Sequence, residues 1–174
     1  LKEFLKHADR CGVPEEAIGR IFTESSFNAG RLAKHGEDFF SLFDMLGQCH
    51  RLYISRFYST DMLAELYSAV TGVEVTPADL KLASERVWNL WKVLNYRAGF
   101  DRKDDEPPEI WFQPLKGVDK EYYLKDYFGT TNLTRKDVDQ LLDDYYDEHG
   151  WDKKTSQPTA KKLKELSLDS LAST

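Results

Sequence analysis

The sequence is poor in cysteine and has no long apolar run. Its 174 residues include only Cys11 and Cys49, too few for the disulfide framework of a small secreted protein, so a reducing, cytoplasmic location is expected. No apolar segment approaches the roughly 20 residues of a membrane-spanning helix. No basic and then apolar leader with a cleavage site is recognisable, so the sequence contains no export signal of that type.

The sequence also lacks an excess of positive charge, with 24 Lys and Arg against 30 Asp and Glu. The formal net charge is −6 and the sequence pI is about 5.3, whereas proteins that bind nucleic acids or anionic membranes usually present a basic surface. Nucleic acid is therefore not an expected partner. The hydrophobic fraction of 41% is sufficient for the core of one domain of ordinary size.

Several common catalytic motifs are missing. The sequence has no phosphate-binding loop, no G-x-S-x-G motif, no H-E-x-x-H motif and no Glu-x-x-His pair, which removes support for the corresponding enzyme classes. His35-Gly36-Glu37 matches half of the zinc deaminase signature, but the P-C-x-x-C half is missing. The histidines are interpreted as surface or cap residues: His7, His35, His50 and His149. No catalytic acid or base is assigned.

Helical periodicity dominates the chain, and we predict an all-α, irregular multi-helix domain. Thr76-Pro77-Ala78-Asp79 is a helix start with a cap, a proline and an acidic residue at the third position, and Thr134 with Asp137 resembles a capping box. Further starts are predicted at Asn28, at Ser59 or Thr60, and at Thr159, and helix ends at Gly72, Gly99 and Gly150. Residues 1–27 are predicted to be a helical lead-in to a domain over residues 28–174.

Apolar and charged stripes predict which helix faces are buried. Met62, Leu63, Leu66 and Val70 are expected to point inward. The next helix is expected to carry one apolar face: Leu80, Ala83, Val87, Leu90, Trp91 and Leu94. On it, Trp88 and Trp91 are expected to pack in the core or against another domain. The acidic run is expected to form a solvated face: Asp143, Asp144, Asp147 and Glu148.

The segment from Asp44 to Cys49 is the strongest candidate site. Asp44 offers a carboxylate that accepts hydrogen bonds from a nitrogen heterocycle, and Gly47 allows the chain to turn close to a ligand. The Cys49 thiolate is a ligand type for iron or zinc. One thiolate does not complete a metal site, so further cysteines would have to come from elsewhere. The chain also begins without Met, and we expect it to be a piece of a longer polypeptide.

Beyond this segment, several motifs occur in a fixed order along the chain. They are Asp44-x-x-Gly-x-Cys49, Asp61 to Gly72, Thr76-Pro77, Arg86 to Leu90, Asn95-x-Arg97-x-Gly-Phe100, Arg102 to Asp105, Asp143-x-Tyr-Tyr146, Gly150-Trp-Asp152 and Pro158-Thr159. In this order and spacing, from about Asn28 to Leu168, the chain resembles the C-terminal helical region of tungsten-containing aldehyde:ferredoxin oxidoreductases.

The resemblance implies a tungsten (or molybdenum) bis-pterin centre beside a four-iron four-sulfur cluster. Cys49 would be the fourth cluster ligand, and its three partner cysteines would lie outside this piece. Asp44 would hydrogen-bond one pterin, with the backbone at Gly47 and Gln48 against the same cofactor. The implied partners are the N-terminal domains of the same polypeptide and ferredoxin or an electron-transfer subunit, with a homo-oligomer possible. The implied reaction oxidises aldehydes to acids, and this piece alone is expected to be inactive.

Two departures from the family pattern leave alternatives open. Gln48 stands where the family often has Leu, and His50-Arg51 stand where it often has Lys-Phe. A polar residue and an extra cation would alter redox potential or proton supply. The alternatives are an active-site subunit of an ATP-independent (class II) benzoyl-CoA reductase and a cofactor-free helical interaction module. The charged loop with Arg97, Arg102, Asp104 and Asp105 is either an ion-paired element that lies between domains or beside the cofactor, or a solvated loop.

Overall fold

The computed structural model describes residues 2–49, 51 and 57–171 and confirms the predicted all-α class. The only strand pair in this part of the chain is an antiparallel hairpin of two-residue strands. The elements are α1 (Lys2–Arg10), α2 (Glu15–Ile21), α3 (Ala29–Met45), α5 (Thr60–Thr71), α6 (Pro77–Arg97), η1 (Arg102–Asp104), η2 (Glu109–Phe112), β1 (Leu115–Lys116), β2 (Glu121–Tyr122), α7 (Arg135–His149), α8 (Ala160–Glu165) and η3 (Asp169–Leu171).

The predicted helix starts are confirmed by their capping hydrogen bonds. In each, a side-chain oxygen accepts a hydrogen bond from the backbone N–H three residues further along, which satisfies one of the free donors of the first turn. These residues are Asn28, Ser59, Thr76, Thr134 and Thr159. Gly72 and Gly150 end their helices in the left-handed conformation, with φ of 73° and 71°.

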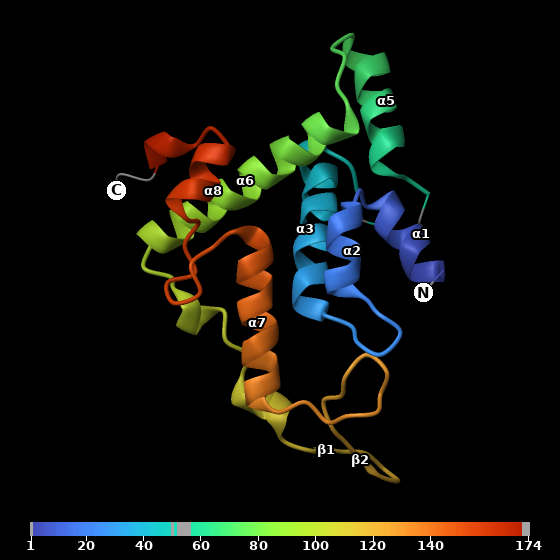
Figure 1. The fold of residues 1–174 in the computed structure, drawn as a ribbon, viewed down its shortest axis with the longest axis vertical. Helices are drawn as coiled ribbons and strands as arrows, with labels where there is room; N and C mark the ends of the chain where they lie inside the picture. The colour runs from blue at the N-terminus through green and yellow to red at the C-terminus, as the bar shows by residue number, and fades with distance from the viewer. Residues whose placement is uncertain (1, 50, 52–56, 172–174) are drawn as a thin grey trace.

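Helix α3 is the centre of the fold (Figure 1). It packs along α7 on one side and against α6 on another, and α2 also lies against it. Phe39, Leu42 and Phe43 of α3 are almost fully buried in a core shared with α1, α2 and α5. The helices of the predicted lead-in thus contribute to the same core, and a boundary between residues 27 and 28 stays a prediction.

The prediction for the inward face of α5 was partly wrong. Leu63 is buried as predicted, but Met62, Leu66 and Val70 are 36%, 46% and 83% exposed. Ala64 is the second buried apolar residue of this helix. The four-residue spacing correctly indicated a helix, but three of the four residues predicted to point inward lie outside the core of this chain.

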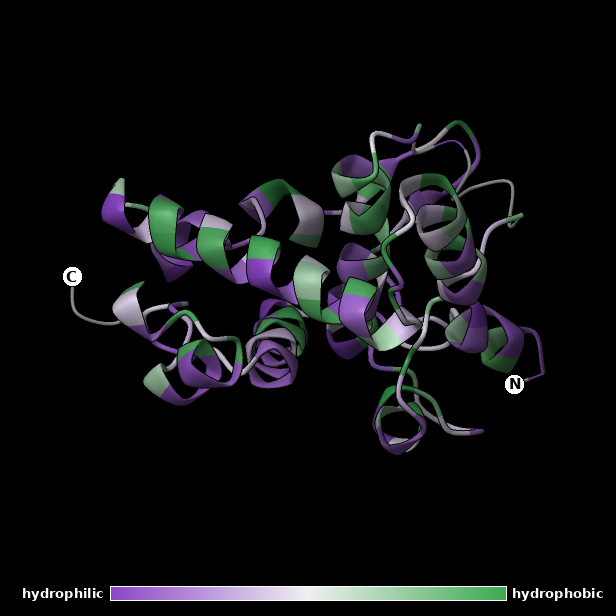
Figure 2. Ribbon diagram, turned by 90° about the horizontal axis from the view of Figure 1, so that it is seen from above, coloured by the Kyte–Doolittle hydropathy of each residue, from purple (hydrophilic) through white to green (hydrophobic). Residues whose placement is uncertain are grey.

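The prediction for the buried face of helix α6 was also partly wrong. Its buried residues include the polar Ser84 and Asn89, whereas Leu90, Trp91 and Leu94 are exposed by 37% to 50%. Hydrophobic segments recur along this long helix in Figure 2. The prediction that Trp91 packs in the core of this chain was wrong, and its packing against another domain stays a prediction. None of the helices in the described residues is both long and apolar enough to cross a membrane.

Candidate functional site

The Asp44–Cys49 segment lies at the carboxyl end of α3. Asp44 occupies the last turn, and the backbone N–H of Gly47 donates to the Asp44 carbonyl at 3.1 Å. The N–H of Gln48 donates to the carbonyl of Phe43 at 2.7 Å, which closes the helix end. Because Phe43 is completely buried, the core fixes the position from which the segment leaves the helix.

Gly47 reverses the chain direction at this point. Its φ is +66°, in the left-handed region that side chains with a Cβ rarely adopt. A Cβ at this position would have no neighbour within 4 Å, so the backbone conformation, and not lack of space, requires glycine. The turn leaves Asp44, Gln48 and Cys49 on the surface, where they are accessible to a group bound from outside.

The donor set of this segment is incomplete as a metal site. Cys49 is exposed and forms no disulfide. No group of three or more His, Cys, Asp or Glu side chains with metal-binding geometry occurs in the described residues. A single exposed thiolate fits the role of one ligand in a site completed by other parts of a polypeptide, and it does not fit a self-contained metal centre.

Two hollows flank the segment. A cavity of about 430 Å³ between the end of α3 and α5 is largely apolar and includes Met45, Leu46 and Gln48 in its lining. A second, open hollow of about 360 Å³ lies between α3 and α6 and is called here the α3–α6 groove. Its lining residues are Ala33, Gly36, Glu37, Phe40, Ser41, Asp44 and Trp88. Asp44 therefore stands at the edge of a concave surface.

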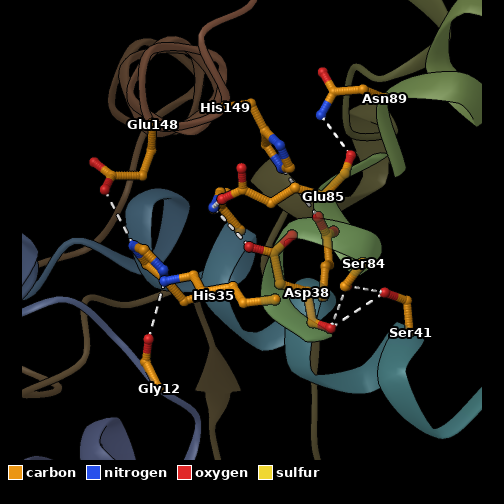
Figure 3. Close-up of polar contacts among 12 residues, drawn as sticks. Gly12, His35, Asp38, Ser41, Ser84, Glu85, Asn89, Glu148 and His149 are labelled. Atoms are coloured by element: carbon orange, nitrogen blue, oxygen red, sulfur yellow. Dashed lines mark hydrogen bonds and ion pairs between the residues drawn. The ribbon is translucent and has the colours of Figure 1, made fainter. Parts of the chain in front are cut away.

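On another face of α3, charged residues of α3, α6, α7 and α8 form what we call the ionic seam. Its members are Arg31, Lys34, His35, Asp38, Glu85, Glu148 and Lys162. Figure 3 labels four of them, His35, Asp38, Glu85 and Glu148. Lys34 is ion-paired with both Asp38, at 2.6 Å, and Glu85. Glu85 also accepts from Lys162 at 2.9 Å, so two ammonium groups and two carboxylates alternate.

The pairing in the ionic seam keeps two of its three carboxylates, Glu85 and Glu148, charged. Burial would raise the pKa of Glu85, but the ammonium groups of Lys34 and Lys162 lower it to about 2. Burial would also raise the pKa of Glu148, yet hydrogen bonds from His35 and from two arginines lower it. Asp38 differs, because burial outweighs the attraction of Lys34 and raises its pKa. The seam thus depends on complete pairing.

Comparison with known proteins places the chain in a family. The sequence model of the family described as "Aldehyde ferredoxin oxidoreductase, domains 2 & 3" matches residues 4–168. The chain belongs to this family. It is 26% identical over 136 residues to the tungsten-containing aldehyde ferredoxin oxidoreductase of Pyrococcus abyssi and 27% identical over 135 residues to that of Pyrococcus furiosus. Each match covers 76% of this chain and 20% of the relative, so the match spans about a fifth of the relatives' length.

Within this aldehyde ferredoxin oxidoreductase domain, two sets of polar residues do not lie where we predicted. His35 and His149, expected at the surface or in caps, are 3% and 1% exposed. The acidic run was expected to be solvated, but Glu148 has a side chain only 5% exposed that binds Arg31 at 2.8 Å. These partners are more than 100 residues apart, so no local pattern could identify them. His50 lies outside the described residues.

The charged loop from Arg97 to Asp105 forms ion pairs and hydrogen bonds with other parts of this chain. Arg102 donates to Asp143 at 2.6 Å, and Asp105 is ion-paired with Lys92 and accepts from the Tyr146 hydroxyl at 2.7 Å. The loop therefore packs on α6 and α7. Arg102 and Asp105 are therefore not part of a freely solvated loop. A contact of this loop with another domain stays a prediction.

The second cysteine has a different environment from Cys49. Cys11 is buried, and burial raises the pKa of its thiol to about 11. Its Sγ lies 3.7 Å from Nε2 of His7. A thiol that resists deprotonation is a poor metal ligand, so Cys11 is not a candidate ligand.

Proposed function

We propose that this chain is the cofactor-contacting C-terminal domain of a tungsten-dependent oxidoreductase that converts aldehydes to carboxylic acids and passes electrons to ferredoxin. The observation that carries the proposal is the position of Asp44, Gly47 and Cys49. They stand exposed at the end of a helix whose core side is fully packed. The names of the relatives supply the reaction class.

The residues present fit part of a shared cofactor site. Cys49 would be the fourth ligand of a four-iron four-sulfur cluster, and Asp44 would accept hydrogen bonds from a pterin ring. The backbone at Gly47 and Gln48 would lie against the same ring, because the glycine turn keeps that side open. The bound tungsten pterin supplies the two-electron oxidation, and the cluster supplies the one-electron steps to ferredoxin.

The remaining parts of the site would come from the rest of the polypeptide. Three further cysteines and most of the bis-pterin contacts would lie in N-terminal domains, since the relatives are about five times as long as the matched region. The exposed apolar face of α6, formed by Leu90, Trp91 and Leu94, is suited to pack against those domains. A ferredoxin or an electron-transfer subunit would be the redox partner, in the cytoplasm.

The test uses the full-length protein purified without oxygen, its Cys49→Ser variant and the matched control Cys11→Ser. The wild type should be brown, contain tungsten and iron, and oxidise acetaldehyde or benzaldehyde with a viologen dye as acceptor. Cys49→Ser should lose cluster absorption and iron, whereas Cys11→Ser should keep both because Cys11 is buried and its thiol resists deprotonation.

Other outcomes would replace the proposal with one of its rivals. An unchanged cluster spectrum and iron content in Cys49→Ser would refute the ligand role. Reduction of benzoyl-CoA without aldehyde oxidation would indicate the benzoyl-CoA reductase branch. A colourless, metal-free protein would indicate an interaction module. The 174-residue chain alone should show no activity, and stoichiometric tungsten in it would contradict the shared site.

A further inference from the structure

Glu37 is the one member of the α3–α6 groove, besides Asp44, that carries a carboxyl group. It lies two helical turns before Asp44 on the same face of α3, since seven residues at 1.5 Å each separate them by about 10 Å. Its side chain is 33% exposed. The groove therefore has a carboxyl at each end, one at the candidate cofactor segment and one further inside the domain.

The two oxygens of Glu37 have different environments. Oε2 accepts a hydrogen bond from the Tyr145 hydroxyl at 2.8 Å, and Nε2 of His149 lies 3.3 Å from the same oxygen. With the His149 proton on Nε2, both neighbours donate to Oε2. A proton on Glu37 is then carried by Oε1, and Glu37 is among the residues that line the groove.

The surroundings of Glu37 favour proton exchange near neutral pH. Burial raises the pKa of its carboxyl to about 7, opposed by the hydrogen bond from Tyr145. The charged groups that face it are Asp38 on its own helix, Lys92 on α6 and Asp105 after η1. His149 on α7 is neutral, because burial lowers its pKa well below the ordinary value. A carboxyl with a pKa near ambient pH both takes up and releases protons readily.

The proposed reaction needs such a group. Oxidation of an aldehyde with water to a carboxylic acid releases two electrons and two protons. The electrons would leave through the cluster on the Cys49 side, so the protons need a separate outlet. A volume of about 360 Å³ holds on the order of ten water molecules at roughly 30 Å³ each.

We propose that Glu37 is a proton-relay residue, which accepts protons on Oε1 from water in the α3–α6 groove beside Asp44 and releases them to solvent at the open side. The step moves only protons: the carboxylate becomes a carboxylic acid and returns to a carboxylate, with no change in oxidation state. This inference rests on the proposed function for the source of the protons, but the titration of Glu37 is a property of this chain.

Infrared titration of the full-length protein tests the inference without turnover. The wild type should show the C=O band of a protonated carboxyl that disappears with a midpoint near pH 7, and Glu37→Gln should lack this band. Tyr145→Phe should shift the midpoint to higher pH, because it removes a hydrogen bond that lowers the pKa of Glu37. The control Glu24→Gln, at an exposed site, should leave the band unchanged. A spectrum that is the same in Glu37→Gln and the wild type would overturn the assignment.

Turnover separates this inference from the proposed function. With acetaldehyde and a viologen dye, Glu37→Gln should lower kcat by about tenfold or more and increase the solvent deuterium isotope effect, with unchanged tungsten and iron content. Wild-type kcat and isotope effect in a metal-loaded, active Glu37→Gln enzyme would refute the relay and leave the proposed function standing. A wild-type protein without tungsten would refute the proposed function, and the infrared titration would still decide the state of Glu37.

Discussion

Helix α6 differs from most surface helices in which residues it buries and which it exposes. Beside the apolar Leu80 and Val93 it buries two polar residues: Ser84 donates to the Asp38 carbonyl at 2.6 Å, and Asn89 accepts from the Trp151 ring N–H at 2.8 Å. Further toward its C-terminal end the helix exposes Leu90, Trp91 and Leu94. An amphipathic helix normally turns its apolar stripe to the core of its own domain.

This difference indicates two kinds of contact. The buried polar residues of α6 are satisfied by this chain, because their hydrogen bonds and ion pairs have specific partners on α3, on α8 and at Trp151 after α7. The exposed apolar residues Leu90, Trp91 and Leu94 are not buried by the described residues of this chain. An exposed apolar patch of this kind typically marks a contact with another domain or protein. The domain therefore combines an interior held by directional bonds with an outer face suited to non-directional packing.

The largest effect is expected from breaking the ionic seam at its centre. Lys34→Met removes the ammonium that Asp38 and Glu85 share, and leaves two carboxylates in a site where Lys34 itself is only 5% exposed. Loss of one partner from a buried pair costs about 3 to 5 kcal/mol. Chemical denaturation should show this loss in the free energy of unfolding.

A surface lysine provides the matched control for that experiment. Lys6→Met breaks an exposed pair with Glu3, whose side chains are 63% and 77% exposed, so a change below about 1 kcal/mol is expected. If Lys34→Met were no more destabilising than Lys6→Met, the ionic seam would not hold the helices together. The buried polar residues of α6 would then not be what stabilises the interior of the domain.

A smaller loss is expected where α3 and α7 approach most closely. A Cβ on Gly30 would lie 2.0 Å from the carbonyl oxygen of Leu141, so Gly30→Ala forces the two helix backbones apart. The expected cost is about 1 to 3 kcal/mol, despite the better helix propensity of alanine. Gly19→Ala is the control, because a Cβ there meets nothing within 4 Å, and it should be neutral or stabilising. Equal denaturation midpoints for the two variants would contradict this close approach.

The elements predicted best from the sequence are those determined locally. Thr134 and Asp137 form a complete capping box because all the groups involved lie within four residues. The faces of α5 and α6 were predicted less well. Hydrophobicity indicates that Trp91 is buried by something, but not whether the partner belongs to this chain. The pairing of Arg31 with Glu148 was missed because it joins residues 117 positions apart.

The candidate site was predictable only in part. The family resemblance pointed to Asp44, Gly47, Gln48 and Cys49, and their roles stay predictions. Glu37 was noted only as half of an incomplete motif. Two features of the sequence are consistent with a groove at this place. Glu37 lies seven residues before Asp44, and the small residues Ala33 and Gly36 come just before Glu37 on the same helix. The decisive contact, from Tyr145 of α7, depends on the tertiary fold and leaves no local signal.

Substitutions of the exposed apolar residues of α6 are expected to change the stability of this chain least. They are expected to affect the binding of this domain to the rest of the polypeptide instead. In the 174-residue chain, Trp91→Gln and Leu94→Gln should each change the free energy of unfolding by about 0.5 kcal/mol or less, because both side chains are about half exposed. Leu80→Gln, at a site 6% exposed, is the control and should cost several times more. With the remainder of the polypeptide supplied as a separate chain, the Trp91 and Leu94 variants should bind it more weakly than the wild type, as measured by calorimetry. Unchanged binding would mean that this face packs elsewhere, and a loss of stability equal to that of Leu80→Gln would mean that it is already covered within the chain.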